Sequence, residues 1–223
     1  MKFGAAEQLA RIVVGSAQLE GNLSLPRDAS GVVLFAHGSG SSRHSPRNQY
    51  VAQALRDGGL GTLLIDLLTA AEEREDARTA RLRFDIGLLA DRVVGASDWL
   101  ARNTATAQLP IGYFGASTGA AAALVSASER PDYVRAVVSR GGRPDLAIPV
   151  LNRLKAPTLL IVGGADAPVI EMNRDALKHL SIEKRLEIVP GATHLFEEPG
   201  TLEEVARLAR EWFQAHLKPY TGQ

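Results

Sequence analysis

The sequence predicts an α/β protein, with a mainly parallel central sheet that carries helices on both faces. Short, continuous apolar runs are typical of strands covered on both sides, and they alternate along the chain with longer segments of helical periodicity. This alternation continues from residue 31 to residue 217, with no internal repeat, low-complexity tract or linker. We therefore expect a single domain over residues 1–223.

The first strands are expected to form an antiparallel hairpin at one edge of the sheet. Residues 11–25 alternate in part with period two and carry glycines at the breaks. The apolar run 31–36 predicts the first central strand. The later expected elements are a helix at 48–57, a strand at 61–66, a helix over 84–100, a strand around 111–114, a helix through 120–124, strands at 134–139 and 158–162, a helix at 169–180, a strand at 185–189 and a helix at 202–217.

One segment interrupts the alternation. Acidic and basic residues crowd into 67–83, and we expect this segment to be a surface loop. Only residues 140–156 separate two of the later strands, which is too short for a folded cap domain. The expected architecture therefore has no cap, and its nearest equivalent to a lid is the charged segment 67–83.

Composition excludes several classes of function. Lys plus Arg and Asp plus Glu number 25 each, so the overall charge gives no reason to expect a nucleic acid or membrane partner. Cysteine is absent, which excludes disulfides, thiolate metal sites and a cysteine nucleophile. No histidine pair has metal-binding helical spacing, and we expect neither a signal peptide nor a membrane span. We expect a cytoplasmic protein with no metal and no cofactor.

The most informative stretch is Gly115-Ala116-Ser117-Thr118-Gly119, a G-x-S-x-G pentapeptide. An apolar strand precedes it and a strong helix-forming run follows it, so the chain turns sharply from strand to helix at the serine. Such a turn forces the serine into a strained conformation, which small residues two positions away on either side make possible. Ser117 is therefore the candidate nucleophile.

A serine nucleophile needs a base and a carboxylate that orients the base. Of the five histidines, His194 follows the last expected strand and should face Ser117 at the carboxyl edge of the sheet. His44 is a weaker alternative in a loop. Asp166 follows the strand 158–162 and gives the chain order expected of a nucleophile elbow. Asp145 is the rival acid, although it could equally be a helix cap.

Two further groups of residues complete the predicted site. The N–H groups of Ser39, in the glycine-rich turn that begins at His37, and of Thr118 are the expected oxyanion donors. Arg43, Arg140 and Arg143 are candidate ligands for a negative group on the substrate, because guanidinium groups bind carboxylates in bidentate fashion. Alternatively, these arginines pair with acidic residues of the chain or solvate loops.

With these motifs over residues 31–217, the chain resembles the α/β-hydrolase fold and, within it, the cap-less dienelactone hydrolase-like group. The resemblance implies Ser117 as nucleophile, Asp166 as acid and His194 as base, with the His-Gly-Ser turn and Thr118 as oxyanion hole. The chain departs from the group in having serine where dienelactone hydrolases use cysteine. What the resemblance implies is cleavage of a small ester or lactone through an acyl-enzyme.

The sequence leaves other functions to weigh against ester cleavage. Acyl transfer to an alcohol or a thiol, and thioester hydrolysis, use the same acyl-serine and leave no separate trace in the sequence. A non-catalytic binding protein could keep the same fold. A dinucleotide site at the turn 38–43 is disfavoured, because Arg43 stands where the third glycine of that motif would be needed.

Overall fold

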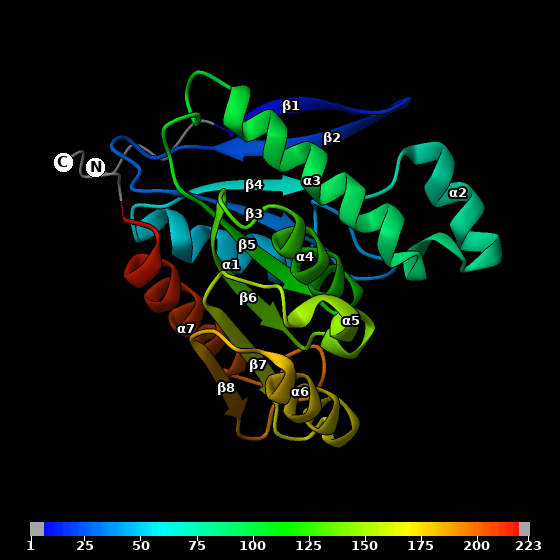
Figure 1. Ribbon diagram of the computed structural model, residues 1–223, viewed down its shortest axis with the longest axis vertical. Coiled ribbons are helices and arrows are strands. Elements are labelled where there is room, and N and C mark those ends of the chain that lie inside the picture. The colour runs from blue at the N-terminus through cyan, green and yellow to red at the C-terminus, as the bar shows by residue number, and fades with distance from the viewer. Residues whose placement is uncertain (1–6, 219–223) are drawn as a thin grey trace.

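The computed structural model describes residues 7–218, which build one eight-stranded sheet in the order β1-β2-β4-β3-β5-β6-β7-β8 (Figure 1). β1 and β2 form an antiparallel hairpin, β2 is antiparallel to β4, and the other pairings are parallel. The strands are β1 (Glu7–Val14), β2 (Ala17–Ser24), β3 (Val32–Ala36), β4 (Gly61–Ile65), β5 (Ile111–Ala116), β6 (Val134–Arg140), β7 (Thr158–Gly163) and β8 (Lys184–Val189). The predicted fold class, including the hairpin, is confirmed.

Helices cover both faces of the sheet (Figure 1). The two on one face are α1 (Pro46–Asp57) and α7 (Thr201–His216), which pack against each other. The opposite face carries α3 (Ile86–Arg102), α4 (Thr118–Glu129), the short α5 (Ile148–Leu151) and α6 (Ala167–His179), with the 3-10 turn η2 (Pro144–Ala147) before α5. The segment between β6 and β7 thus holds only short helical turns and no cap.

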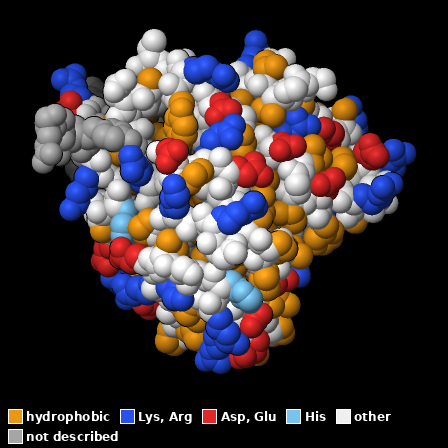
Figure 2. All heavy atoms as spheres, in the orientation of Figure 1, with side chains coloured by type: hydrophobic (Ala, Val, Ile, Leu, Met, Phe, Trp, Pro, Cys, Tyr) orange, Lys and Arg blue, Asp and Glu red, His pale blue; other side chains and the backbone are white. Residues whose placement is uncertain are grey.

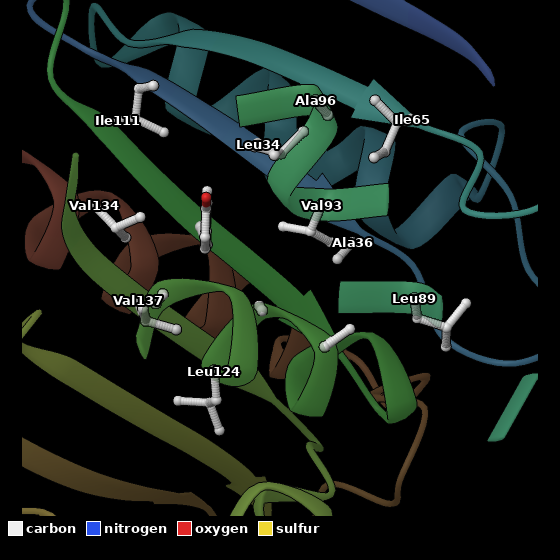
Figure 3. Close-up of a cluster of buried hydrophobic side chains, with 14 of the residues drawn as sticks. Leu34, Ala36, Ile65, Leu89, Val93, Ala96, Ile111, Leu124, Val134 and Val137 are labelled. Carbon is white, nitrogen blue, oxygen red and sulfur yellow. The ribbon is translucent and has the colours of Figure 1, made fainter. Parts of the chain in front are cut away.

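The sheet separates two hydrophobic cores. Figure 3 shows part of the larger one, a cluster in which Leu89 and Val93 of α3 are buried together with Leu34 of β3 and Ile65 of β4. All four side chains are at most 3% exposed, and full burial of each contributes about 1.5–3 kcal/mol relative to exposure. The second core fills the space under α1 and α7. With both faces packed, the carboxyl ends of the parallel strands are held in fixed register.

The expectation of a loop at 67–83 is wrong, because this segment folds as α2 (Ala70–Thr79) followed by the 3-10 turn η1 (Leu82–Phe84). Thr69 and Glu72 form a capping box: Thr69 Oγ1 accepts from the Glu72 N–H, and Glu72 Oε2 accepts from the Thr69 N–H. The charged residues that suggested a loop instead lie along a mostly exposed helix, and most of them are good helix formers. In Figure 1, α2 lies beyond the carboxyl edge of the sheet.

The surface carries interspersed charges. Figure 2 shows Lys and Arg side chains mixed with Asp and Glu over the visible face, in keeping with equal numbers of acidic and basic residues. Within residues 7–218, no helix has the length and apolar character needed to cross a membrane.

Candidate active site

Ser117 occupies the junction between β5 and α4 in a strained backbone conformation, with φ 51° and ψ −121°. Side chains at Gly115 and Gly119 are impossible here. A Cβ at Gly115 would collide with the backbone of Ala120, and one at Gly119 would collide with the carbonyl oxygen of His37. The glycines of the pentapeptide are therefore required by the close approach of β3 and α4, as the sequence predicts for a nucleophile elbow.

The hydroxyl of Ser117 is not used to cap α4, although Ser117 stands at the N-cap position. Its backbone is fixed from the next strand instead: the Ser117 N–H donates to the carbonyl of Arg140 over 3.3 Å, and the Arg143 N–H donates to the Ser117 carbonyl over 3.2 Å. The hydroxyl group thus sits at the positive end of a helix, on a backbone that neighbouring segments hold in place.

His194 and Asp166 form a hydrogen-bonded pair on the loops that follow β8 and β7. Nδ1 of His194 lies 2.6 Å from Oδ2 of Asp166, whose side chain is 14% exposed. The two loops are tied together, because the Ala165 N–H donates to the Ala192 carbonyl over 2.9 Å. Since Nδ1–H donates to the carboxylate, Nε2 is the ring nitrogen left free to accept a proton.

Gly141 connects this pair to the serine. It follows Arg140, whose carbonyl holds Ser117, and it adopts a left-handed φ of 52°. A Cβ built on Gly141 would lie 3.5 Å from both Nδ1 and Cε1 of His194. The segment 140–143 therefore touches Ser117 on one side and the imidazole on the other, and it brings all three predicted residues to one edge of the sheet.

The turn formed by residues 37–40 borders Ser117 on the other side. A Cβ at Gly38 would lie 3.0 Å from the Cβ of Ser117, so the turn packs directly against the serine. Ser39 Oγ lies 3.0 Å from Oγ1 of Thr118, the first residue of α4. The two residues expected to supply oxyanion donors are therefore in contact with each other.

His37 fixes the start of this turn. Its Nδ1 lies 2.9 Å from the Gly38 carbonyl oxygen, and its Nε2 accepts from the Leu67 N–H over 3.0 Å. This pattern requires a neutral ring that is protonated on Nδ1. Burial lowers the pKa of His37 below its ordinary value, although the hydrogen bond to Gly38 and the charge of Asp66 oppose the effect.

Two of the three predicted anion-binding arginines are already paired with carboxylates of the chain. Arg43 forms ion pairs with Asp66 and with Glu20, the latter at 2.6 Å. Arg143 makes a two-point contact with Asp145, at 2.9 and 2.7 Å, and this hydrogen-bonded partner raises its pKa. Binding a substrate anion at either residue would compete with these pairs.

Arg140 differs from the other two because it is buried and no carboxylate among residues 7–218 pairs with it. It is 7% exposed, its NH2 group lies 3.5 Å from Asn48 Oδ1, and its guanidinium carbon lies 5.8 Å from the centre of the Phe196 ring. Its Nε has no hydrogen-bond partner in the part of the chain that the structure describes. Burial, together with the nearby charge of Arg47, lowers the pKa of Arg140 to about 10.

The remaining candidates are not part of the His194–Asp166 pair. His44 is exposed in the loop before α1, and Asp145 lies in η2, paired with Arg143. Sequence reasoning did not single out Gly141, Phe196 or the buried Asp76 of α2. A lone glycine, phenylalanine or aspartate carries no motif, so no sequence signal marks them. Within residues 7–218, no group of three or more His, Cys, Asp or Glu side chains is arranged to hold a metal ion.

The sheet order, the strand-to-helix turn at Ser117 and the loops beyond β7 and β8 define a member of the α/β hydrolases. The chain belongs to the dienelactone hydrolase family, whose model matches residues 19–218. This membership, together with the 63% identity to a dienelactone hydrolase of known structure, supports the conclusion that the chain is a hydrolase.

Solved structures agree with this assignment. A dienelactone hydrolase from Anabaena variabilis is 63% identical to the chain and superposes with a TM-score of 0.95, over 96% of this chain and 100% of that one. An α/β serine hydrolase without lid from Xanthomonas campestris has a TM-score of 0.76 at 19% identity, over 97% of this chain and 98% of that one. The second similarity shows the fold alone.

A curated relative carries a different name. A protein of Mycobacterium tuberculosis provisionally named a phosphoribosyl transferase is 56% identical to this chain over 211 residues. The match covers 95% of this chain but 47% of the relative. The chain therefore spans about half the length of the curated relatives that it matches.

Proposed function

We propose that this chain is a serine hydrolase that cleaves a carboxylic ester or lactone through an acyl-enzyme. Ser117 Oγ attacks the carbonyl carbon while His194 Nε2 takes its proton and passes it to the leaving alcohol. Asp166 holds the imidazole in the required tautomer. Water, deprotonated by His194, then attacks the acyl group, releases the acid and restores Ser117.

The N–H groups of Ser39 and Thr118 are the proposed donors to the oxyanion of each tetrahedral intermediate. Loss of one such donor costs about 3 kcal/mol of transition-state stabilisation in hydrolases of this kind. The contact between the side chains of Ser39 and Thr118 supports this pairing, because it keeps the turn 37–40 against the start of α4.

One observation carries the proposal: a serine with φ 51° at the end of β5 shares the segment 140–143 with an imidazole that is hydrogen-bonded to a carboxylate. Strain at a non-glycine residue persists only where the surrounding structure enforces it, and such residues cluster at active sites. Packing alone gives no reason to combine a strained serine with a histidine–aspartate pair.

The test combines labelling with turnover. Wild-type protein should react with a fluorophosphonate at Ser117 and hydrolyse a short-chain p-nitrophenyl ester. Ser117→Ala should lose both, and His194→Ala should lose turnover, whereas His44→Ala serves as the control that keeps it. Labelling at another residue, or unchanged turnover in Ser117→Ala, would refute the mechanism.

Phosphoribosyl transfer is not proposed for this chain. The relative that carries the name is about twice as long, and the matched region is the one with hydrolase-family similarity. The glycine-rich turn after β3, which could otherwise suggest a phosphate site, packs against Ser117 through Gly38.

We further propose that the substrate carries a negative group that pairs with Arg140, the one predicted anion ligand left without a carboxylate. The charge of Arg47, whose own guanidinium pairs with Glu197 at 3.2 Å, also lowers the pKa of Arg140. A buried, unpaired cation is costly, and an anionic substrate group would offset that cost.

A further inference from the structure

A buried carboxylate on α2 is joined to the turn at Ser39 by a chain of hydrogen bonds. Asp76 is 1% exposed, although α2 is otherwise exposed or half-buried. Its Oδ1 accepts from the N–H groups of Leu82 and Arg83 over 2.7 and 3.0 Å, and its Oδ2 accepts from Arg83 Nε over 2.6 Å. The charge is therefore paired and both oxygens are satisfied.

These bonds fix η1. A 3-10 turn of three residues has few hydrogen bonds of its own, and Asp76 supplies the acceptor for its first two N–H groups. Burial alone would raise the pKa of Asp76, but the hydrogen bonds from Arg83 and Leu82 outweigh it and hold the pKa below its ordinary value. Asp76 is thus ionised at neutral pH.

From η1 the chain of contacts reaches the proposed oxyanion donors. The carbonyl of Arg83 accepts from Ser39 Oγ over 3.5 Å, and the same hydroxyl lies 3.0 Å from Thr118 Oγ1. The gap between η1, α2 and the turn 37–40 is partly open to solvent and has a volume of about 10 Å³, no more than one water molecule needs. The hydrogen bond from Ser39 Oγ to Arg83 links the two segments directly, so a shift of η1 would be passed to Ser39.

We propose that Asp76 is a positioning residue for the oxyanion hole: through Arg83 it holds the Ser39 hydroxyl, and with it the Ser39 N–H, in line with Thr118. The inference rests on the proposed hydrolase function. It gives α2 and η1 a role in transition-state stabilisation, whereas the sequence suggested only a surface loop. Asp76 itself touches no reacting atom.

The first test is steady-state hydrolysis of a p-nitrophenyl ester by Asp76→Ala, with the fold checked by circular dichroism. An oxyanion donor acts mainly in the transition state, so kcat should fall about tenfold while KM stays within about twofold. Asp76→Asn keeps an oxygen for the two backbone N–H groups, and it should stay within about threefold of wild type. Asp85→Ala, which removes the cap of α3 right after η1, should leave kcat unchanged.

A double-mutant cycle with Ser39→Ala separates positioning from general loosening. If Asp76 acts through the Ser39 hydroxyl, Asp76→Ala in the Ser39→Ala background should cost less than about twofold in kcat. Should Asp76→Ala fail to fold, the cycle is run with Asp76→Asn, whose loss of up to about threefold should likewise vanish in that background.

The outcomes distinguish the two proposals. An unchanged kcat in folded Asp76→Ala, an effect on KM alone, or equal losses in both Ser39 backgrounds would overturn the role of Asp76 while leaving the serine mechanism intact. Wild-type protein that neither turns over the ester nor reacts with a fluorophosphonate at Ser117 would overturn both.

Discussion

Nδ1 of His194 lies 2.6 Å from Oδ2 of Asp166, and this contact joins the loops that follow the last two strands of the sheet. The two loops also share a backbone hydrogen bond between Ala165 and Ala192. The pair is therefore held by the sheet itself, and its geometry does not depend on a flexible side chain that reaches across the surface.

Asp166→Asn tests the role of this carboxylate. The amide cannot hold the histidine in the same tautomer, so we expect kcat for ester hydrolysis at neutral pH to fall roughly 10³-fold or more, with little change in the thermal midpoint. Asp145→Asn is the matched control, since Asp145 pairs with Arg143 and should keep most of the activity. A larger loss in Asp145→Asn than in Asp166→Asn would reverse the assignment of the acid.

Gly141→Ala tests how closely the segment 140–143 fits the imidazole. The new methyl group would lie 3.2 Å from the His194 carbonyl oxygen and 3.5 Å from the ring, so we expect kcat to fall at least tenfold. The left-handed φ of 52° adds a stability cost of about 1–2 kcal/mol.

Gly59→Ala is the control for that strain. Gly59 has φ 82°, and a Cβ there would meet nothing within 4 Å. Gly59→Ala should lower the free energy of unfolding by about as much as the strain at Gly141→Ala does, and it should leave kcat unchanged. Equal kcat values for the two variants would show that contact with His194 has no effect on catalysis.

Much of this architecture could be predicted because its signals are local. Each central strand is a short apolar run and most helices have strong periodicity, so the observed bounds differ from the expected ones by a few residues. The candidate residues Ser117, Asp166 and His194 could be named because each lies within five residues of the end of a parallel strand, and the carboxyl ends of such strands share one edge. The fold places all three at that edge, and their chemistry stays a prediction.

What could not be predicted depends on tertiary contacts. The segment 67–83 looked like a loop because its charges hid a capping box, and nothing in the sequence shows that Asp76 turns inward while its neighbours face solvent. Likewise, the sequence does not show which of Arg43, Arg140 and Arg143 is free to bind an anion. Only folding shows that two of them meet carboxylates and the third does not.

The neutral, buried His37 predicts a pH dependence of stability. Its pKa in the folded protein lies below the ordinary value of 6.5, so the unfolded chain binds more protons as pH falls through that value. The free energy of unfolding should therefore decrease below about pH 6.5 and recover above it. Urea unfolding at pH 5 and pH 7.5 measures the difference, which should shrink in His37→Gln. An identical pH dependence in that variant would show that other groups are responsible.

Arg140→Met separates a binding role from a structural one. If Arg140 served only the fold, replacing it would be neutral or harmful to activity on every substrate alike. Because it is a buried cation with no carboxylate partner, an apolar side chain of similar length should raise the free energy of unfolding by about 1 kcal/mol or more. The same variant should lose at least tenfold in kcat/KM on a p-nitrophenyl ester whose acyl chain ends in a carboxylate, and less than twofold on the neutral ester of equal length.

Arg143→Met, which instead leaves Asp145 without its partner, should lower stability and not discriminate between the two esters. Equal losses on both esters by Arg140→Met would remove the anion-binding proposal and leave the serine mechanism untouched.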